Sequence, residues 1–355
     1  MDHKELAERI RVVAPGTQLR FALDKIVAAN TGALIFLVDD FEKYKDLMQV
    51  GFFLNCPFNP NKLYELSKMD GAIVVDESLN KIIAANVQLT PDPSIPSLQT
   101  GMRHRTAERM ARQTGKMLLA ISKRQGTITI FFGENSHVLA PVEILLPRVN
   151  QVIRTVEQYR QTFAYGLDQI DVLERASVLT LYDVLKTLEK GLMVLLISKE
   201  AELTLVELGK FGLPSRMQLD EITDGIPEEI ENLVLDFAKE QVTIDKIEEL
   251  MEKLLSLTER EISNYVTLAR VLGYDISSSS QAMELNMRSR GIRFVRKIPK
   301  IPLQVALNVG AKYGSLARLL KTSVEELKEV EGVGEKRARA IRHAIDIHNK
   351  REELE

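Results

Sequence analysis

This 355-residue chain has a single cysteine and no long apolar run, and both absences exclude classes of protein. Because Cys56 has no partner in the chain, an intrachain disulfide and a CxxC zinc or redox site are excluded. No apolar run approaches the roughly 20 residues that span a bilayer, which argues against a membrane protein. The N-terminus is polar and lacks the apolar core of a secretory signal, so we expect a cytoplasmic protein.

The charges are distributed unevenly, although the net charge is only −3. Residues 286–355 hold 16 Lys/Arg and 9 Asp/Glu, a net of +7, whereas residues 220–262 hold 14 acids and 4 bases, a net of −10. Six of the bases fall within residues 288–300, which contain no acid. A basic C-terminal region predicts contact with a polyanion, and the alternative is that solvated helix faces simply differ in charge.

The first part of the chain alternates between helical and strand patterns. The apolar run over residues 33–38 is short and bounded, which favours a buried strand. Gly115 stands where a helix-ending glycine is expected. We therefore predict an α/β domain with a mixed central sheet over residues 1–145. Its expected helices cover residues 5–13, 18–30, 61–69 and 103–114, and its expected strands cover 33–38, 71–75, 81–89, 117–122, 127–132 and 136–140.

The middle and end of the chain predict an all-α region. Apolar residues recur at steps of three and four over 149–173, which is the pattern of a long amphipathic helix. Residues 146–285 lack glycine-rich loops and polar clusters, so we expect a helical spacer or oligomerisation element. Ser277–Ser280 is read as a linker. Residues 286–355 form the expected third, C-terminal domain.

A Gly-x-Gly sequence lies between two helical patterns near the C-terminus. Gly332 and Gly334 allow a tight turn and leave backbone N–H groups open at the start of the next helix, where Lys336 and Arg337 add positive charge. This is the form of a helix-hairpin-helix, which grips the DNA backbone without reading its sequence. Residues 301–320 resemble a degenerate second hairpin. The alternative reading is a glycine-capped turn with two incidental bases.

Asp70-Gly71 precedes an apolar strand pattern in the N-terminal part. An aspartate before a glycine is usually a turn residue. Near a triphosphate, the same carboxylate could hold Mg²⁺ or take a proton from a ribose hydroxyl.

A second N-terminal pattern places two arginines around a histidine at the start of a predicted helix. Gly101 permits close approach of a ligand to the backbone, and Arg103, His104 and Arg105 follow it. A positive charge opposes the helix dipole at this end unless an anion is bound there. The pattern therefore favours a phosphate site over a solvated basic face.

These two patterns, about thirty residues apart, resemble the diadenylate cyclase domain. The resemblance is close over residues 63–73 and 100–109. The order of cyclase domain, helical spacer and helix-hairpin-helix is similar to that of the bacterial DNA-integrity scanning proteins, the DisA family.

The resemblance implies condensation of two ATP into cyclic di-AMP with release of two pyrophosphates, using Mg²⁺ or Mn²⁺. It implies an octamer in which cyclase domains meet face to face, so that the 3′-hydroxyl of one ATP attacks the α-phosphorus of the other. It also implies that the C-terminal domain binds branched double-stranded DNA, such as junctions, and that this binding inhibits the cyclase.

The resemblance also implies roles for single residues. Asp70 would bind the metal and help to activate the 3′-hydroxyl, and His104 would lie beside the metal and the phosphates. Arg103 and Arg105 would contact phosphate oxygens. The further residues implied in nucleotide binding are Gly71, Ala72, Leu89, Gly101, Met102, Thr106 and Ser122.

Gln125 departs from the family, since relatives tend to carry an arginine there. Weaker polyphosphate affinity, or compensation by Lys123, would follow. The competing hypothesis is a DNA-junction-binding protein whose nucleotide domain only senses ATP or cyclic di-AMP. Retention of both Asp70 and the Arg103/Arg105 pair favours the enzyme. A nuclease is disfavoured, because no acidic cluster in a two-metal pattern accompanies the hairpin.

Overall fold

The computed structural model describes residues 3–352 and divides into two compact units. The first unit runs to Asn150 and also includes Ala201–Arg216. The second unit consists of Gln151–Glu200 and the described residues from Met217 onward.

A single mixed sheet forms the centre of the first unit. The strand order is β2-β5-β4-β1-β6-β7-β8, and β3 pairs with β5 outside this path. β1 and β4 are parallel, with Ile35 opposite Ile73, and the other pairs are antiparallel, which confirms the predicted mixed sheet. The strands are β1 (Ala33–Val38), β2 (Met48–Gln49), β3 (Phe52–Pro57), β4 (Ala72–Asp76), β5 (Lys81–Leu89), β6 (Leu118–Ile121), β7 (Ile128–Phe132) and β8 (Asn135–Leu139).

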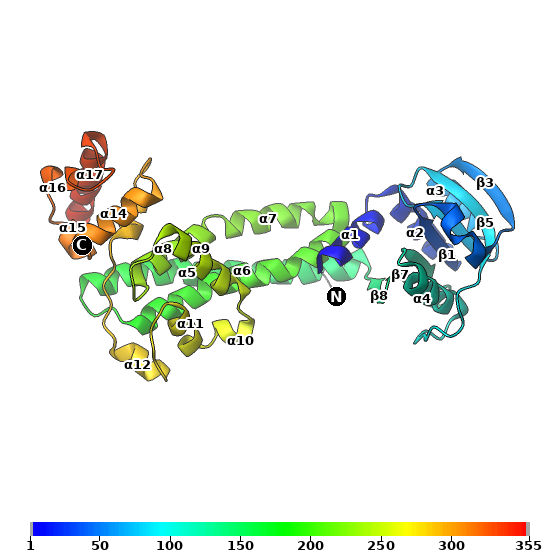
Figure 1. Ribbon diagram of the computed structural model, residues 1–355, viewed down its shortest axis with the longest axis horizontal. Helices are drawn as coiled ribbons and strands as arrows, with labels where there is room; N and C mark the ends of the chain where they lie inside the picture. Colours follow the sequence, from blue (N-terminus) through cyan, green and yellow to red (C-terminus); the bar gives the residue numbers. More distant parts are fainter. Residues whose placement is uncertain (1–2, 353–355) are drawn as a thin grey trace. The chain divides into compact units, whose positions relative to one another are not determined.

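Helices cover both faces of this sheet, as Figure 1 shows. Alternate residues of β1 point to opposite faces, so Ile35 packs with α1 to α3 while Phe36 packs with α4. All six residues of β1 are buried, which explains its continuous apolar sequence. The helices of this part are α1 (His3–Val13), α2 (Gln18–Ala28), the 3-10 helix η1 (Phe41–Leu47), α3 (Pro60–Leu66) and α4 (Met102–Thr114).

The edge of the sheet near β3 was not predicted. Phe52 and Phe53 are more than half exposed, so β3 lacks the apolar signal of a buried strand. Asn55 has a positive φ of 37°, and the pairing of β3 with β5 shifts register around it. A bulged, exposed strand of this kind has no simple alternation to recognise.

Residues 201–216 belong with the sheet, although the sequence pattern assigned them to the spacer. Glu207 accepts a hydrogen bond from the Ala140 amide at 2.5 Å, and its other oxygen lies 2.9 Å from His137 Nε2. The Lys210 amide donates to the Pro15 carbonyl at 2.9 Å. These contacts join residues distant in sequence, which helical periodicity alone does not reveal.

The second unit is helical, as predicted. A Cβ added at Gly166 would lie 2.7 Å from Thr187 Oγ1, and one added at Gly191 would lie 2.8 Å from Phe163. Glycine therefore permits close packing of α5 on α6. The remaining helices of the chain are α5 (Val142–Arg175), α6 (Leu181–Leu208), the 3-10 helix η2 (Gly209–Gly212), α7 (Leu213–Thr223), α8 (Ile226–Phe237), α9 (Ile244–Ser256), α10 (Glu259–Ile262), α11 (Tyr265–Val271), α12 (Ser279–Glu284), α13 (Ile292–Arg296), α14 (Leu303–Tyr313), α15 (Leu316–Leu319), α16 (Val324–Lys328) and α17 (Glu335–Glu352).

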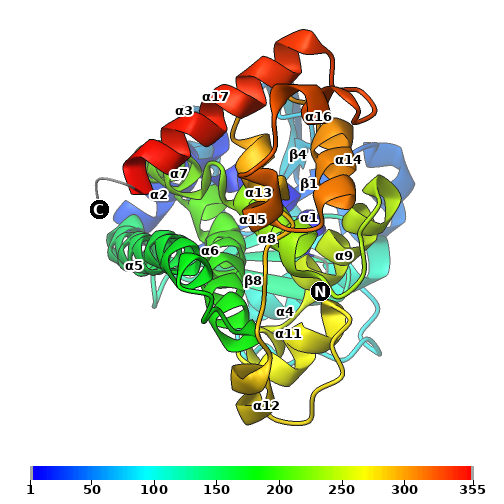
Figure 2. The same cartoon turned by 90° about the vertical axis from the view of Figure 1, so that its left-hand side faces the viewer.

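One prediction for this region needs correction. Ser277–Ser280 is not a free linker, because Ser278 caps α12 through its hydroxyl. The expected boundary between spacer and C-terminal domain stays a prediction, since by their contacts both parts belong to one compact unit. Figure 2 shows α13 to α17 gathered in one bundle at the end of the chain.

The start of the basic segment 288–300 is bound to the spacer. The Arg290 guanidinium donates to four carbonyls around the end of α8, of which the shortest contact is 2.6 Å to Ala238. In return, the buried Asp236 carboxylate accepts the amides of Ile292 at 2.8 Å and Arg293 at 3.2 Å. The spacer and the segment therefore cap each other's helix ends.

Three more bases of this segment pair with spacer acids. Arg293 pairs with Asp171, Arg296 lies 2.7 Å from Glu231, and Lys297 lies 3.5 Å from Glu229. Much of the positive charge that the sequence pattern assigned to a polyanion is therefore used inside the chain.

Candidate functional site

A cleft of about 720 Å³ opens in the first unit, at one end of the central strands of the sheet. It lies where β1 and β4 begin, where β5 and β6 end, and beside the first turn of α4. Ten of the residues predicted for nucleotide, metal or catalytic roles line it, namely Asp70, Gly71, Ala72, Leu89, Gly101, Met102, Arg103, His104, Thr106 and Ser122.

The Asp70-Gly71 turn requires glycine at its second position. Gly71 has a φ of +86°, and an added Cβ would lie 2.9 Å from the Val87 carbonyl oxygen. The Asp70 carbonyl accepts a hydrogen bond from Asn86 Nδ2 at 3.1 Å. The turn is therefore held against β5 at the floor of the cleft.

The first turn of α4 supplies positive potential to the cleft. Gly101 caps this 13-residue helix without a side-chain hydrogen bond, so the first N–H groups remain open, and the helix dipole is positive at this end. The Arg103 guanidinium lies over Gly32, where an added Cβ would be 2.9 Å from Nη1. Gly32 therefore makes room for Arg103, a role that sequence reasoning missed.

His104 is half-buried beside Arg103 and packs edge-on against the Phe131 ring at 6.1 Å between centroids. Burial lowers the pKa of His104, and the Arg103 charge lowers it further. The imidazole is therefore neutral at pH 7 and has a nitrogen lone pair for a metal ion or a proton.

The sequence implied that Arg105 contacts phosphate oxygens without indicating in which subunit, and Arg105 does not line this cleft. Arg105 Nε instead faces the Gln99 carbonyl at 3.4 Å, in the proline-containing loop before α4.

That loop is fastened to α4 by buried and half-buried groups. The Glu108 carboxylate accepts the Ser97 hydroxyl and, at 3.2 Å, the Leu98 amide. Arg109 Nε donates to the Ile95 carbonyl at 2.8 Å. These contacts fix the loop that leads into Gly101.

The turn after β6 adds two bases, Lys123, which the sequence offered as compensation for Gln125, and Arg124, which was not among the predicted nucleotide-binding residues. Ser122 Oγ accepts the Gln125 amide at 3.2 Å, which shapes the turn. Lys123 and Arg124 line the cleft, whereas Gln125 does not. Positive charge is thus available here without an arginine at position 125.

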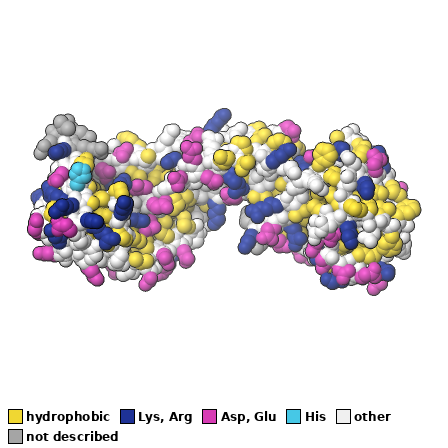
Figure 3. Space-filling view, turned by 90° about the horizontal axis from the view of Figure 1, so that it is seen from above, with side chains coloured by type: hydrophobic (Ala, Val, Ile, Leu, Met, Phe, Trp, Pro, Cys, Tyr) yellow, Lys and Arg dark blue, Asp and Glu magenta, His cyan; other side chains and the backbone are white. Residues whose placement is uncertain are grey.

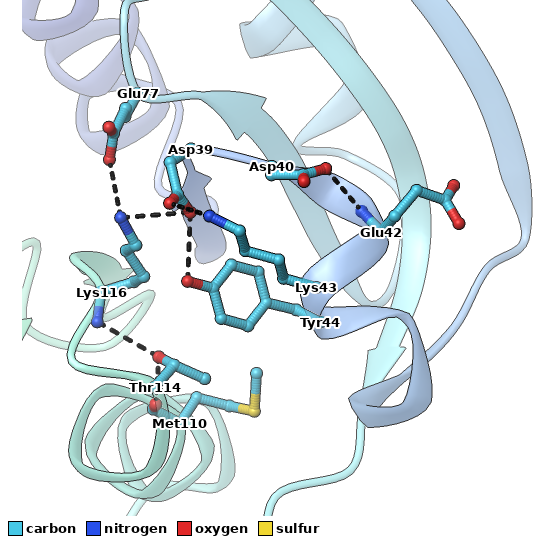
Figure 4. A network of polar contacts seen from close by, with 9 residues as sticks. All are labelled: Asp39, Asp40, Glu42, Lys43, Tyr44, Glu77, Met110, Thr114 and Lys116. Atoms are coloured by element: carbon cyan, nitrogen blue, oxygen red, sulfur yellow. Dashed lines mark hydrogen bonds and ion pairs between the residues drawn. The ribbon is translucent and has the colours of Figure 1, made fainter.

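The C-terminal end of α4 is anchored by a network of polar contacts at the other end of these strands (Figure 4). Lys116, just after the helix, lies 3.1 Å from Asp39 and 3.2 Å from Glu77, which follow β1 and β4. Hydrogen bonds from Lys43, Lys116 and Tyr44 hold the pKa of Asp39 far below its ordinary value. The network therefore positions the helix whose first turn borders the cleft.

The donors in the cleft fit a divalent cation that is shared with a phosphate ligand. Asp70 offers a carboxylate and His104 a neutral imidazole on the same cleft. Residues 3–352 contain no group of three His, Cys, Asp or Glu that could form a complete metal cage. Mg²⁺ and Mn²⁺ at nucleotide sites use few protein ligands and complete their shells with phosphate and water, so the residues present fit such an ion.

The predicted DNA-binding hairpin joins α16 to α17. Gly332 has a φ of +81°, and its carbonyl accepts a hydrogen bond from Arg337 at 2.7 Å, so Arg337 closes the turn. Gly334 differs, because its φ is not positive and an added Cβ would meet nothing within 4 Å. Neither its backbone conformation nor contacts within the described chain require glycine at 334, and the space around it is open.

Lys336 is exposed and has no hydrogen bond or ion pair within residues 3–352. Figure 3 shows Lys and Arg side chains gathered, with Asp and Glu among them, on the left where the C-terminal helices lie. The hairpin therefore combines an open backbone turn with accessible positive charge.

Comparison with known proteins assigns the chain to a family. Residues 20–136 match the family described as DisA bacterial checkpoint controller nucleotide-binding, residues 139–281 match the DisA bacterial checkpoint controller linker region, and residues 315–344 match the helix-hairpin-helix motif. A DNA integrity scanning protein DisA from Thermotoga maritima is 45% identical over 342 residues, which cover 96% of this chain and 95% of the relative. The chain belongs to the DisA family.

More distant relatives and solved structures extend the comparison. DisA proteins of Acetivibrio thermocellus and Bacillus pumilus are 38% and 37% identical, covering 95% and 96% of this chain and 92% and 93% of the relatives. A mutant of DacA from Staphylococcus aureus covers 40% of this chain and 91% of its own at 20% identity, with a TM-score of 0.29.

Family membership confirms the nucleotide-binding domain, the helical linker and the helix-hairpin-helix that the sequence patterns predicted. It supports a nucleotidyl cyclase with a checkpoint role. No described helix of the structure is both long enough and apolar enough to cross a membrane.

Proposed function

We propose that this protein condenses two ATP into cyclic di-AMP, releases two pyrophosphates, and is inhibited when its C-terminal hairpin binds branched DNA. The observation that carries the proposal is the convergence of Asp70, Arg103 and His104 on one cleft at the N-terminus of α4. Transfer at phosphorus depends on positioning and charge neutralisation, and this cleft supplies both.

Each group in the cleft has a distinct task. Arg103, Lys123 and Arg124 neutralise the triphosphate, and the first turn of α4 adds backbone N–H donors. Asp70 and His104 would hold Mg²⁺ or Mn²⁺, which neutralises phosphate charge when bound. Leu89 is 8% exposed and offers an apolar surface for adenine.

The reaction requires a second ATP in the correct orientation. Within residues 3–352, one cleft contains this combination of groups. A 3′-hydroxyl from another ATP must therefore come from a second copy of the chain. Arg105, which is exposed outside its own cleft, is available to that neighbouring nucleotide, and the proposed assembly is a homo-octamer with cyclase domains face to face.

The C-terminal hairpin is proposed to bind the backbone of DNA junctions through Gly332, Gly334 and Lys336. Arg337 contributes through the turn that it closes. Contacts of this kind recognise phosphate positions rather than bases, so the preference is for DNA shape. We place this binding inside the cell, where both ATP and chromosomal DNA are present.

One experiment tests the activity and its coupling to DNA together. The purified protein is incubated with ATP and Mg²⁺ or Mn²⁺, with and without a four-way junction, and cyclic di-AMP and pyrophosphate are measured by mass spectrometry and chromatography. We expect product that falls when the junction is added. Bound ATP without product under either metal would instead support the nucleotide sensor.

A matched pair of variants assigns the chemistry to the cleft. Asp70→Asn is expected to abolish synthesis while DNA binding is unchanged. Asp46→Asn, in the exposed part of η1, serves as the control and retains synthesis. Loss of both synthesis and DNA binding in a folded Asp70→Asn protein would contradict the division of labour.

A further inference from the structure

Asn86 has an unusual backbone conformation in the interior of β5. Its φ is +50°, in the left-handed region that few residues other than glycine enter, although Asn enters it more readily than most. The pairing on either side shows why: Ala72 is opposite Val87 and Val74 is opposite Ala84. β5 thus has one more residue than β4 across this interval, and such a bulge redirects a side chain.

Asn86 joins three segments of the chain, through its side chain to Asp70 and through its backbone to Gly51. Asn86 Nδ2 donates to the Asp70 carbonyl at 3.1 Å, and the Asn86 carbonyl accepts the Gly51 amide at 3.2 Å. A Cβ added at Gly51 would lie 2.5 Å from Asn86 Oδ1. Glycine at 51 therefore leaves room for Asn86, which also lines the cleft.

The Asp70 side chain is otherwise unrestrained. Asp70 is exposed, and within residues 3–352 its carboxylate has no hydrogen bond or ion pair. The backbone of the Asp70-Gly71 turn therefore sets the position of the Asp70 Cα–Cβ bond, from which the carboxylate reaches the cleft. Two features fix that turn, the positive φ of Gly71 and the hydrogen bond from Asn86.

We propose that Asn86 is a positioning residue for Asp70, whose side-chain amide holds the turn so that the Asp70 carboxylate faces the cleft. The inference rests on the proposed function, in which Asp70 holds the metal ion and helps to activate the 3′-hydroxyl. Asn86 acts through Asp70, so its loss should change turnover and metal dependence more than ATP binding.

The test uses the full chain and a pair of matched variants. Asn86→Gly keeps a residue that adopts the same φ without strain and removes the side chain with its amide. Asn55→Gly is the control, because Asn55 also has a positive φ in a bulged strand but does not line the cleft. Cyclic di-AMP synthesis is measured across ATP and Mn²⁺ concentrations, together with thermal unfolding.

We expect Asn86→Gly to lower kcat by about tenfold or more, since small displacements of a reacting group have effects of this size. The Mn²⁺ concentration for half-maximal rate should rise, while the KM for ATP changes by less than about threefold. Asn55→Gly should match the wild type in kcat, in the Mn²⁺ concentration for half-maximal rate and in the KM for ATP. Equal kcat and Mn²⁺ dependence in the two variants would overturn the inference.

A second variant keeps the inference testable if Asn86→Gly does not fold. Asn86→Asp retains the size and the conformational preference of the residue but replaces the donor with an acceptor, so we again expect lower kcat. Full activity in Asn86→Asp would show that the donor is unnecessary.

A binding measurement separates this inference from the proposed function. Wild-type protein that makes no cyclic di-AMP under either metal would overturn the proposed function. Mn²⁺ affinity in the presence of ATP, measured by electron paramagnetic resonance, still tests Asn86. Weaker Mn²⁺ binding in Asn86→Gly than in Asn55→Gly would support its positioning role, and equal binding would refute it.

Discussion

Two arginine-rich segments of this chain look alike in sequence and are used in opposite ways. At the start of α4, no acid within residues 3–352 pairs with Arg103 or Arg105, and Arg103 borders the cleft. In the segment 288–300, by contrast, Arg290 caps α8 and three further bases pair with spacer acids. A cluster of positive charge therefore indicates a ligand site only if the fold leaves that charge without internal partners.

The largest expected effect lies at the first segment. Arg103→Ala should lower kcat/KM for cyclic di-AMP synthesis by about 10²–10³, the usual cost of removing a positioned electrostatic contact to the reacting group. Thermal stability should remain close to that of the wild type. Arg9→Ala, which removes a surface arginine of α1, is the control for synthesis and unfolding. A loss below threefold in Arg103→Ala would contradict its placement on the phosphates.

The second segment should respond in stability instead. Arg290→Ala removes a guanidinium that donates to four backbone carbonyls, so the free energy of unfolding should fall by about 2 kcal/mol. Arg288→Ala, in the same segment but exposed, should be nearly neutral. Urea unfolding measures both. If Arg290→Ala weakened DNA binding without a change in unfolding, the contrast between the two segments would fail.

The hairpin glycine offers a sharper test of DNA contact. Gly334→Ala should preserve the fold, because an added Cβ meets nothing within the described chain, while DNA affinity falls by about tenfold as the phosphate is pushed away. Its salt dependence should remain unchanged, since no charge is lost. Lys336→Ala should instead reduce the slope of log affinity against log salt by about 1. Unchanged junction affinity in Gly334→Ala would place the DNA elsewhere.

A separate expected effect is a pH dependence of stability at Asp236. Burial raises the pKa of Asp236 from 3.8 to about 7, against the lowering effect of the Ile292 and Arg293 amides and the Arg290 charge, while the Glu174 charge raises it further. The folded state then binds a proton that the unfolded state has lost, so the free energy of unfolding falls as pH rises from about 4 to about 7.

Asp236→Asn cannot titrate and should flatten this dependence. One proton accounts for at most about 1.4 kcal/mol per pH unit. Glu174, whose pKa is also raised by burial, should leave part of the slope in place. Urea unfolding at several pH values between 4 and 8 measures the difference, and identical slopes in both proteins would contradict it.

The sequence predicted elements whose signals are local. β1 was recognised from six consecutive apolar residues, and the end of α4 from Gly115, which has a φ of +70°. β3 was missed because its apolar residues are exposed and its register is interrupted at Asn55. Exposure and register depend on neighbouring strands, so local composition does not reveal them.

The residues of the candidate site also fall into two groups, those with a local sequence signal and those without one. Asp70-Gly71-Ala72 and the first turn of α4 were predicted because each forms a continuous pattern. Gly32 and Asn86 were missed, since their roles arise only when β1, β4 and β5 are aligned with the helix. A polar Asn between apolar strand residues was the one available signal for the bulge. Arg105 stays a predicted phosphate contact, because it does not line the cleft of its own chain and its Nε faces the Gln99 carbonyl.

The mutual capping of Asp236 and Arg290 determines where this chain can be shortened. A truncated protein that ends before residue 286 removes the Ile292 and Arg293 amides whose hydrogen bonds the Asp236 carboxylate accepts. It also uncovers the carbonyls at the end of α8. Activity lost in such a protein would reflect damage to the helical unit rather than the absence of the DNA hairpin. A chain that ends at Ile298 retains α13 and its ion pairs, and is the more informative DNA-free enzyme.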